Sequence, residues 1–203
     1  DAIHPSFDAK FVLPIDLLDN GAIEPSVAGP LSSLTLPALL GSLKPVFDDA
    51  SPTDDDDAFA SALPIARAFV EASIRNVAAK ARAQSMVKEA IAKAGSSAIL
   101  ELPMGMPYRS ALDEAGADHI LFVVNPRGGD WTLGGIKLSG DSFDQRADLP
   151  EAWAGLSDAA LEDASGVKGA KFCHKARFIA VADSRDAILK MAEIAAQTAL
   201  AQA

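Results

Sequence analysis

Cysteine is nearly absent, because Cys173 is the only one in 203 residues. A single thiol excludes an intrachain disulfide and a cysteine-based zinc site, and it fits a reducing compartment. The sequence also lacks an apolar run near the ~18 residues of a membrane span, and it lacks a basic segment followed by an apolar one at its start. We therefore expect a cytoplasmic protein without a signal peptide or membrane span, and a buried Cys173.

Positive charge is scarce as well. The chain has 18 Lys and Arg residues against 28 Asp and Glu residues, which gives a net charge of -10. This balance argues against general electrostatic binding to nucleic acid, because no sequence-wide cationic field displaces the counterions of phosphates. A local basic groove, or a metal ion that reverses the sign of charge at one site, stays open.

Several familiar catalytic signatures are missing. The sequence has no Walker A motif, no Rossmann glycine fingerprint, no nucleophile-elbow serine and no His-Glu-x-x-His. A complete active site cannot be assembled from these residues. The chain opens on Asp1 rather than on methionine, and we expect it to start inside a longer protein. With 49% hydrophobic residues, it is rich enough to form one or two domains with real cores.

Apolar residues recur every three or four positions in the first half of the chain, which is typical of helices. Three helices are predicted: residues 7–18, a second from Ser32 or Ser33 to about 43, and a long one from about 55 or 63 to 94. The first ends at Asn20 or Gly21, and the third ends at Gly95. An acidic loop at 48–57 precedes the long helix, and its last aspartates suit a helix N-terminus. At about 1.5 Å per residue, this helix is long enough to connect two domains.

The second half changes to a pattern of strands and helices. Strands are predicted at 98–102, 119–125, 131–138 and 171–181, and helices at 108–114, 159–164 and 184–200, the last capped by Ser184. The first two strands and the helix between them form a β-α-β unit. We expect Phe122, Phe143 and Trp153 in the core, because no alternation of aromatic and basic residues suggests base stacking. The sequence therefore predicts an α/β protein whose mixed sheet has flanking helices.

Asp16 and Asp19 lie three residues apart near the end of the first predicted helix. On a regular helix, both carboxylates point to one side, as ligands of a divalent metal would. The spacing by itself is a weak signal for a metal site, and it favours a capping pair or a solvated pair.

Gly128, Gly129 and Asp130 stand between two predicted strands. Glycines with positive φ would make a tight hairpin turn here, with Asp130 bonded to its own backbone. A loop that contacts phosphate explains the same residues equally well.

His174 lies in a predicted strand beside Lys175 and Arg177. Two cations beside a titratable group suit contact with a phosphate or a carboxylate. A lone histidine in a strand is more often structural, and the two basic neighbours are what supports a functional role for His174.

A series of short motifs appears in a specific order. They are IDLLDNG at 15–21, GGDW at 128–131, SFDQR at 142–146, LPEAWAGL at 149–156, SG at 165–166 and FCHKARFI at 172–179. This series resembles the melanocyte-proliferating-gene-one family over nearly the whole chain. By that resemblance the protein is related to the DHH phosphoesterases, which use manganese-type dinuclear sites and include exonucleases.

The resemblance implies three parts. Residues 1–47 would be the C-terminal remnant of a DHH catalytic domain, 48–95 an acidic loop and connector helix, and 96–203 an α/β substrate-binding domain. The family's early metal ligands, including its Asp-His-His motif, precede the Asp-Asn-Gly segment and are not in this chain. Asp19, with Asp16 as second choice, would remain as a late ligand, and Mn²⁺ or Mg²⁺ would be bound mainly by residues absent from this chain.

The implied reaction is hydrolysis of a phosphodiester by metal-activated water, and the narrower reading is a 3'-to-5' RNA exonuclease. The resemblance implies substrate contacts at Gly128, Gly129, Asp130, Arg146, His174, Lys175 and Arg177. The family commonly has a glycine after the histidine segment, where this chain has Arg177, and a basic residue where it has Thr132. Arg177 would then supply a charge that is lost elsewhere.

The expected partners are a phosphoester or single-stranded nucleic acid substrate and the missing N-terminal domain. A second copy of the chain is a further expected partner, if the long helix exposes an apolar face. The alternative function is a non-catalytic α/β module that binds a nucleotide or a protein, with the long helix as its interaction surface.

Overall fold

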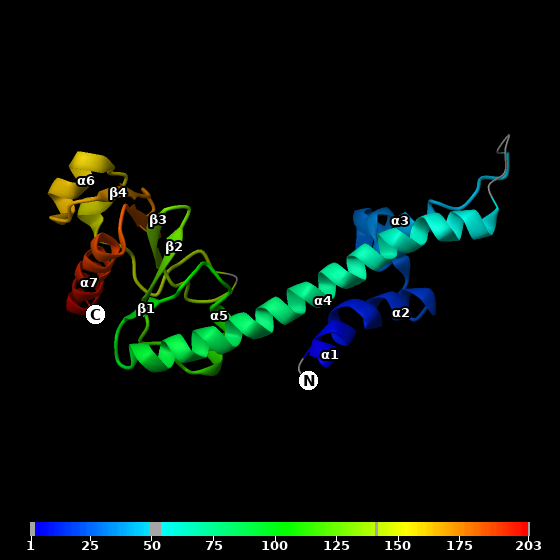
Figure 1. Cartoon of the computed structure of the whole chain (residues 1–203), viewed down its shortest axis with the longest axis horizontal. Helices are drawn as coiled ribbons and strands as arrows, with labels where there is room; N and C mark the ends of the chain where they lie inside the picture. The colour runs from blue at the N-terminus through cyan, green and yellow to red at the C-terminus, as the bar shows by residue number, and fades with distance from the viewer. Residues whose placement is uncertain (1–2, 49–53, 141, 203) are drawn as a thin grey trace. The chain divides into compact units, whose positions relative to one another are not determined.

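The structure is a computed structural model, and it describes residues 3–48, 54–140 and 142–202. The chain divides into two compact units, Asp1–Arg82 and Ala83–Ala203. The boundary falls inside the long helix α4 (Asp55–Ala94), so this helix contributes to both units. The predicted α/β class is confirmed (Figure 1). The predicted division at residues 47 and 95 stays a prediction.

The N-terminal unit begins with a continuous helical run. It comprises α1 (Ile3–Phe7), the π-helical turn η1 (Asp8–Val12) and α2 (Leu13–Asp19). The predicted helix at 7–18 is therefore confirmed, and Pro14 is accommodated in the first turn of α2. The run ends as expected, because Gly21 has a φ of +67°.

The second predicted helix begins later than expected. Residues Pro25–Leu34 form the 3₁₀ segment η2, and α3 spans Leu36–Gly41 with Thr35 at its N-cap. The predicted start at Ser32 or Ser33 is therefore wrong. Pro37 has no backbone N–H and suits the first turn of a helix, where that group would lack a partner, so the helix starts just before it.

Helix α4 confirms the predicted long helix. It starts at the earlier of the two predicted positions, with Asp55, Asp56 and Asp57 in its first turn, where the helix dipole favours negative charge. Gly95 ends it with a φ of +56°. The part of the predicted acidic loop at 49–53 lies outside the described residues.

The C-terminal unit is built on a five-stranded sheet. In spatial order its strands are β1 (Ile99–Glu101), β2 (Phe122–Arg127), β3 (Asp130–Gly135), β5 (Ile179–Ala182) and β4 (Ala170–Cys173). Strands β1 and β2 are parallel and connected through α5 (Arg109–Glu114), which confirms the predicted β-α-β unit. The other neighbouring pairs are antiparallel.

Helices cover the two faces of this sheet to different extents. Helix α7 (Arg185–Gln202) contacts all five strands, and the Ser184 hydroxyl accepts a hydrogen bond from Ala187 N–H, as its predicted capping role requires. On the other face, Val87 of α4 and Leu112 of α5 pack over β1 and β2. Predicted core residues Phe122, Trp153 and Cys173 are buried below α7.

Two expectations about the second half are wrong. The predicted strand at 171–181 is a hairpin of β4 and β5, whose connection at 174–178 includes Arg177 with a φ of +56°. Phe143, predicted to be in the core, is 90% exposed in the segment between β3 and η3 (Glu151–Trp153). The turn at 174–178 was not predicted, because residues 171–181 contain no glycine or proline. The exposure of Phe143 was not predicted, because periodicity does not show which contacts hold a loop.

The remaining helix, α6 (Asp158–Ser165), matches its prediction and ends at Gly166, which has a φ of +68°. Among the described residues, no helix has both the length and the apolar character to cross a membrane.

Candidate functional site

The predicted contact residues fall at opposite ends of β3. Gly128 and Gly129 make the predicted two-residue hairpin turn between β2 and β3, with φ values of +61° and +94°. Asp130, next in the chain, forms an ion pair with Lys171, with Nζ and Oδ1 2.7 Å apart. This end of the sheet is a tight turn closed by a salt bridge.

The turn at 174–178, here called the His174 turn, lies at the other end of β3. Gly134 pairs with Ile179, and His174 donates its backbone N–H to Ile179 O at 2.9 Å. Gly134 is four positions after Asp130 in β3, which corresponds to about 14 Å along an extended strand. The structure therefore does not bring the two predicted groups together.

The imidazole of His174 is oriented by its own turn. Its Nδ1 accepts a hydrogen bond from Ala176 N–H at 3.0 Å, which makes Nε2 the protonated nitrogen of the neutral ring. The ring centroid is 4.4 Å from that of Phe178 and 6.3 Å from that of Phe172. Within the described part of the chain, Nε2 has no protein partner, so this N–H is free to bind a ligand.

The two phenylalanines make an exposed aromatic surface around His174. Residues that alternate with Phe172 along the hairpin, such as Cys173 and Ala180, face the core under α7. Phe172 therefore points to the opposite face of the sheet, together with its neighbour Val181. Phe172 is 41% exposed and Phe178 is 40% exposed. Strand alternation, which is visible in the sequence, also places Phe172 on the same face as His174.

Lys175 adds an exposed cation at the tip of the turn. Gly155, with a φ of +74°, lies against it, because a Cβ at Gly155 would be 3.8 Å from the Cβ of Lys175. No ion pair occupies Lys175 among the described residues. The turn thus presents an N–H donor, an exposed cation without an ion pair to any described residue, and two partly exposed aromatic rings.

Arg177 is paired within the protein. Its Nη2 is 2.8 Å from Asp148 Oδ2, and its backbone carbonyl accepts the N–H of Leu149. Arg177 and Arg146 border one cavity of about 360 Å³, which Asp148 and Glu151 also line. Two acidic side chains therefore offset the two arginines. No sequence motif points to Asp148, because it lies 29 residues from its partner Arg177.

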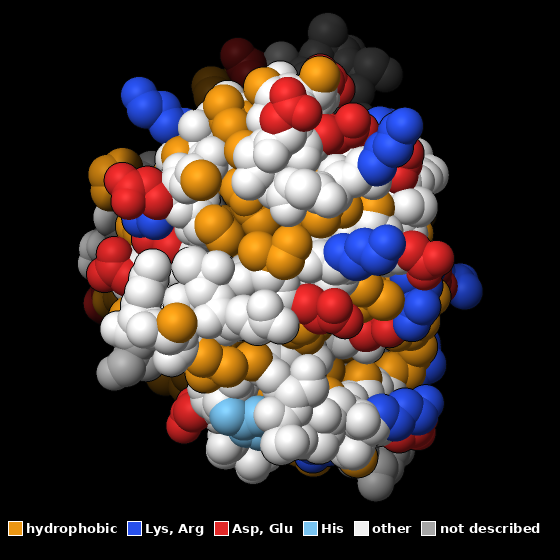
Figure 2. All heavy atoms as spheres, turned by 90° about the vertical axis from the view of Figure 1, so that its left-hand side faces the viewer, with side chains coloured by type: hydrophobic (Ala, Val, Ile, Leu, Met, Phe, Trp, Pro, Cys, Tyr) orange, Lys and Arg blue, Asp and Glu red, His pale blue; other side chains and the backbone are white. Residues whose placement is uncertain are grey.

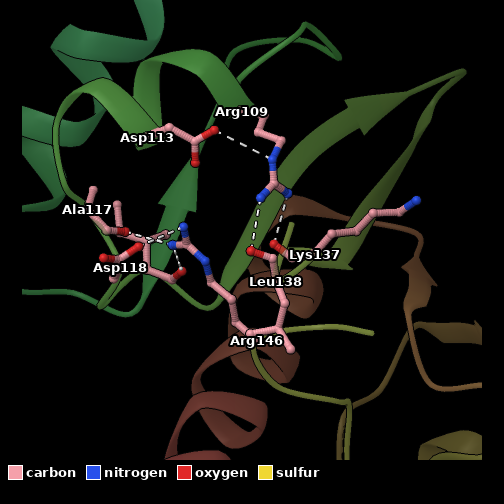
Figure 3. A network of polar contacts seen from close by, with 8 residues as sticks. Arg109, Asp113, Ala117, Asp118, Lys137, Leu138 and Arg146 are labelled. Carbon is pink, nitrogen blue, oxygen red and sulfur yellow. Dashed lines mark hydrogen bonds and ion pairs between the residues drawn. The ribbon is translucent and has the colours of Figure 1, made fainter. Parts of the chain in front are cut away.

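Arg146 binds the protein itself, and Figure 3 shows how. Its side chain is 8% exposed. Nη1 donates to Ala117 O at 2.8 Å and to Ile120 O at 3.0 Å, while Nη2 lies 3.0 Å from Asp118. Arg109 makes the reciprocal connection, because its two terminal nitrogens donate to the carbonyls of residues 137 and 138. Both arginines attach the segment after β3 to the region of α5.

Asp16 and Asp19 do not form a metal site among the described residues. Asp16 accepts a hydrogen bond from Asn20 Nδ2 at 2.9 Å, and both carboxylates are exposed. Asp19 borders a mostly apolar groove of about 830 Å³ in the N-terminal unit. The described residues contain no group of three or more His, Cys, Asp or Glu side chains placed to hold an ion. The residues present thus do not fit a resident metal on their own.

The charged surface of the C-terminal unit is mixed. Figure 2 shows Lys and Arg side chains beside Asp and Glu side chains, with hydrophobic patches between them. Besides the pairs above, Lys88 binds Glu114 and Arg185 binds Glu101 at distances of 2.8 and 2.6 Å. Gln84 also donates a hydrogen bond to Glu114. Over the part of the chain that the structure describes, this surface mixes both signs of charge and presents no broad cationic field.

The fold and the site define an α/β unit with a five-stranded sheet and an exposed histidine turn, preceded in the chain by a long helix. The model of the MYG1 exonuclease family, described as an uncharacterised protein family (UPF0160), matches residues 1–196. The chain belongs to this family, and the resemblance in the sequence is confirmed.

The relatives have low identity to this chain. The MYG1 exonuclease of Rattus norvegicus is 30% identical over 95% of this chain and 54% of its own length, and that of Homo sapiens is 31% identical over 90% and 52%. The MYG1 protein YER156C of Saccharomyces cerevisiae is 26% identical over 96% and 63%. The chain thus spans about half to two thirds of the length of these relatives. No solved structure matches it.

Proposed function

We propose that this chain is part of a metal-dependent phosphoesterase, a 3'-to-5' exonuclease on RNA, and that its C-terminal unit holds the substrate. Relatives named exonucleases cover almost the whole chain, which supports a nuclease-like hydrolase. The observation that carries the substrate-holding role is that Nε2 of His174 has no partner among the described residues and lies beside the rings of Phe172 and Phe178.

The chemistry of the His174 turn suits the end of a single strand. The Nε2–H donates to a phosphate oxygen, and the ammonium of Lys175 adds a charge-assisted contact. The exposed rings of Phe172 and Phe178 offer a surface on which a base stacks without regard to its identity. One donor, one cation and one aromatic surface thus match the parts of one nucleotide.

In this proposal, most residues of the hydrolytic centre lie in the part of the protein outside residues 1–203. A Mn²⁺ or Mg²⁺ site needs several oxygen or nitrogen ligands, and the described residues contribute no such group. Asp19, which has no hydrogen bond to another described side chain, is the carboxylate of this chain that we assign to that site as a single ligand.

We propose that the remainder of the protein, in the part that the relatives have beyond the aligned region, covers the N-terminal unit. The groove beside Asp19 is lined by apolar side chains, including Phe11, Leu40 and Phe59, and Phe59 is 67% exposed. Aligned relatives have nearly as much chain again. Hydrogen exchange at Phe59 and Leu63 should be slower in the complete gene product than in residues 1–203, and equal rates would contradict this contact.

The test of the proposed function is manganese-dependent release of nucleotides from a labelled single-stranded RNA. Residues 1–203 and the complete gene product are compared in parallel, with a chelator as control. We expect release by the complete product only, and order of release from the 3' end. Turnover by residues 1–203 would contradict the split site.

The second candidate is a non-catalytic module that binds a nucleotide or a protein. The absence of a ligand group among the described residues favours it for this chain by itself. In that case the complete gene product would bind labelled RNA or a nucleotide without turnover at any manganese concentration.

A further inference from the structure

Arg177 has an unusual backbone conformation for a residue with a side chain. Its φ is +56°, in the left-handed region that glycine adopts without steric cost. Among the described residues, Asp158 is the other non-glycine residue with positive φ. Such a conformation persists only where surrounding contacts hold it.

Contacts on both sides hold Arg177 in place. The guanidinium forms the ion pair with Asp148 at 2.8 Å and a longer hydrogen bond to Leu149 O at 3.5 Å. The main chain forms two more bonds, because Arg177 N–H donates to His174 O at 2.8 Å and Arg177 O accepts from Leu149 N–H at 2.9 Å. The segment at 148–149 is thus attached to the His174 turn through this one residue.

The same residue fixes how His174 is presented. The bond from Arg177 N–H to His174 O closes the turn on which the imidazole stands. Phe178, whose ring packs against the imidazole, follows Arg177 directly, and its carbonyl accepts Gly135 N–H at 2.9 Å. A change of φ at Arg177 would move both the His174 carbonyl and the Phe178 ring.

We propose that Arg177 and Asp148 are a positioning pair for His174. This inference rests on the proposed role of His174 as a substrate contact. In this proposal Arg177 acts through the turn rather than as a substrate contact, since Asp148 offsets its charge. Instead, the ion pair holds a left-handed residue where the chain must turn, and the turn then aims Nε2 of His174 outward. Asp148 is a functional residue that sequence motifs do not reveal.

The test uses the complete gene product with ¹³C,¹⁵N-labelled histidine, and the signals of His174 are assigned with His174→Ala. The variants are Asp148→Asn, which removes the charge at constant size, and Arg177→Gly, which removes the guanidinium but suits positive φ. Glu114→Gln is the matched control, because it weakens an ion pair of similar length and exposure with Lys88. Thermal unfolding confirms that each variant is folded.

We expect Asp148→Asn and Arg177→Gly to shift the ring signals of His174 and to weaken its contact with Phe178 in the nuclear Overhauser spectrum. A double variant that carries both Asp148→Asn and Arg177→Gly should shift the His174 signals no more than Arg177→Gly alone, because both partners act through one interaction. KM for single-stranded RNA should rise about tenfold, with a smaller change in kcat. Glu114→Gln should change none of these.

Unchanged His174 signals in Asp148→Asn would overturn the positioning pair, and so would additive shifts in the double variant. The spectra need no substrate, so they test the pair separately from the proposed function. If the spectra shift while KM stays constant in every variant, including His174→Ala, the pair stands and the substrate role of His174 fails.

Discussion

Arg146 shows what a single side chain contributes when its charge is nearly buried. Its guanidinium satisfies the carbonyls of Ala117 and Ile120 and pairs with Asp118. Arg146→Ala leaves two carbonyls without this donor, so we expect a loss of about 2–4 kcal/mol in the free energy of unfolding in urea. Arg67→Ala is the control, because its pair with Glu71 is exposed and screened by water, so its loss should change stability far less than Arg146→Ala does. Equal losses of stability in Arg146→Ala and Arg67→Ala would show that the buried hydrogen bonds of Arg146 do not stabilise the fold.

Cys173 is a residue whose inertness can be measured. Burial raises the pKa of its thiol from 9.0 to about 11, while nearby Arg177 lowers it by a smaller amount. The thiolate fraction at pH 8 is then about one in a thousand, so we expect negligible labelling by iodoacetamide in the native chain and rapid labelling in urea. The raised pKa also predicts that this group's contribution to stability is complete below pH 9 and is lost as the pH rises through 11. Rapid native labelling at pH 8 would contradict the burial.

The residue types in the two turns explain why one turn could be predicted from the sequence and the other could not. The pair Gly128 and Gly129 signals a hairpin by composition, and the hairpin is there. The turn before Phe178 has no such signal, because Arg177 takes the position that glycine would normally occupy. Its ion pair with Asp148 is a long-range contact, which local sequence does not encode.

At the scale of elements, the hairpin between β2 and β3 depends on two left-handed residues. Gly129 has a φ of +94°, which a residue with a Cβ rarely adopts, so we expect Gly129→Ala to lower the free energy of unfolding by about 1–2 kcal/mol. Gly128→Asn is the matched control, because asparagine tolerates the φ of +61° at the first position of such a turn. Thermal unfolding of residues 1–203 measures both, and an alanine variant as stable as the wild type would contradict the turn geometry.

The helices and strands could be predicted from periodicity, whereas the loops held by long-range contacts could not. The helices α4 and α7 follow from their spacing and their end signals, and the β-α-β unit follows from alternation of apolar runs. The exposure of Phe143 has another cause. Arg109 and Arg146 attach its segment to partners 26 to 29 residues away, and no local pattern contains that information. The same limit applies to Asp16 and Asp19, whose spacing fits a metal pair or a solvated pair.

At the scale of the whole molecule, the C-terminal unit contains its own two cores. Val87, which is fully buried, and Ile91 of α4 pack into the second core, so the last turns of this helix belong to the fold of the unit. We expect residues 83–203 to unfold cooperatively in urea. Residues 96–203 lack these side chains and should be less stable by about 3 kcal/mol or more. Equal stability would place the boundary at the end of the helix instead.

We propose that His174 holds the substrate in an RNA-degrading hydrolase, and the kinetics of two histidine variants test this role. The rate of manganese-dependent nucleotide release from labelled single-stranded RNA is measured with the complete gene product as wild type, His174→Ala and His119→Ala. His119 is an exposed histidine whose Nε2 bonds Gly95 O, and it serves as the control. We predict that His174→Ala raises KM by about tenfold to a hundredfold, because a hydrogen bond to a charged group is lost, while His119→Ala matches the wild type. Unchanged kinetics in His174→Ala would contradict the claim.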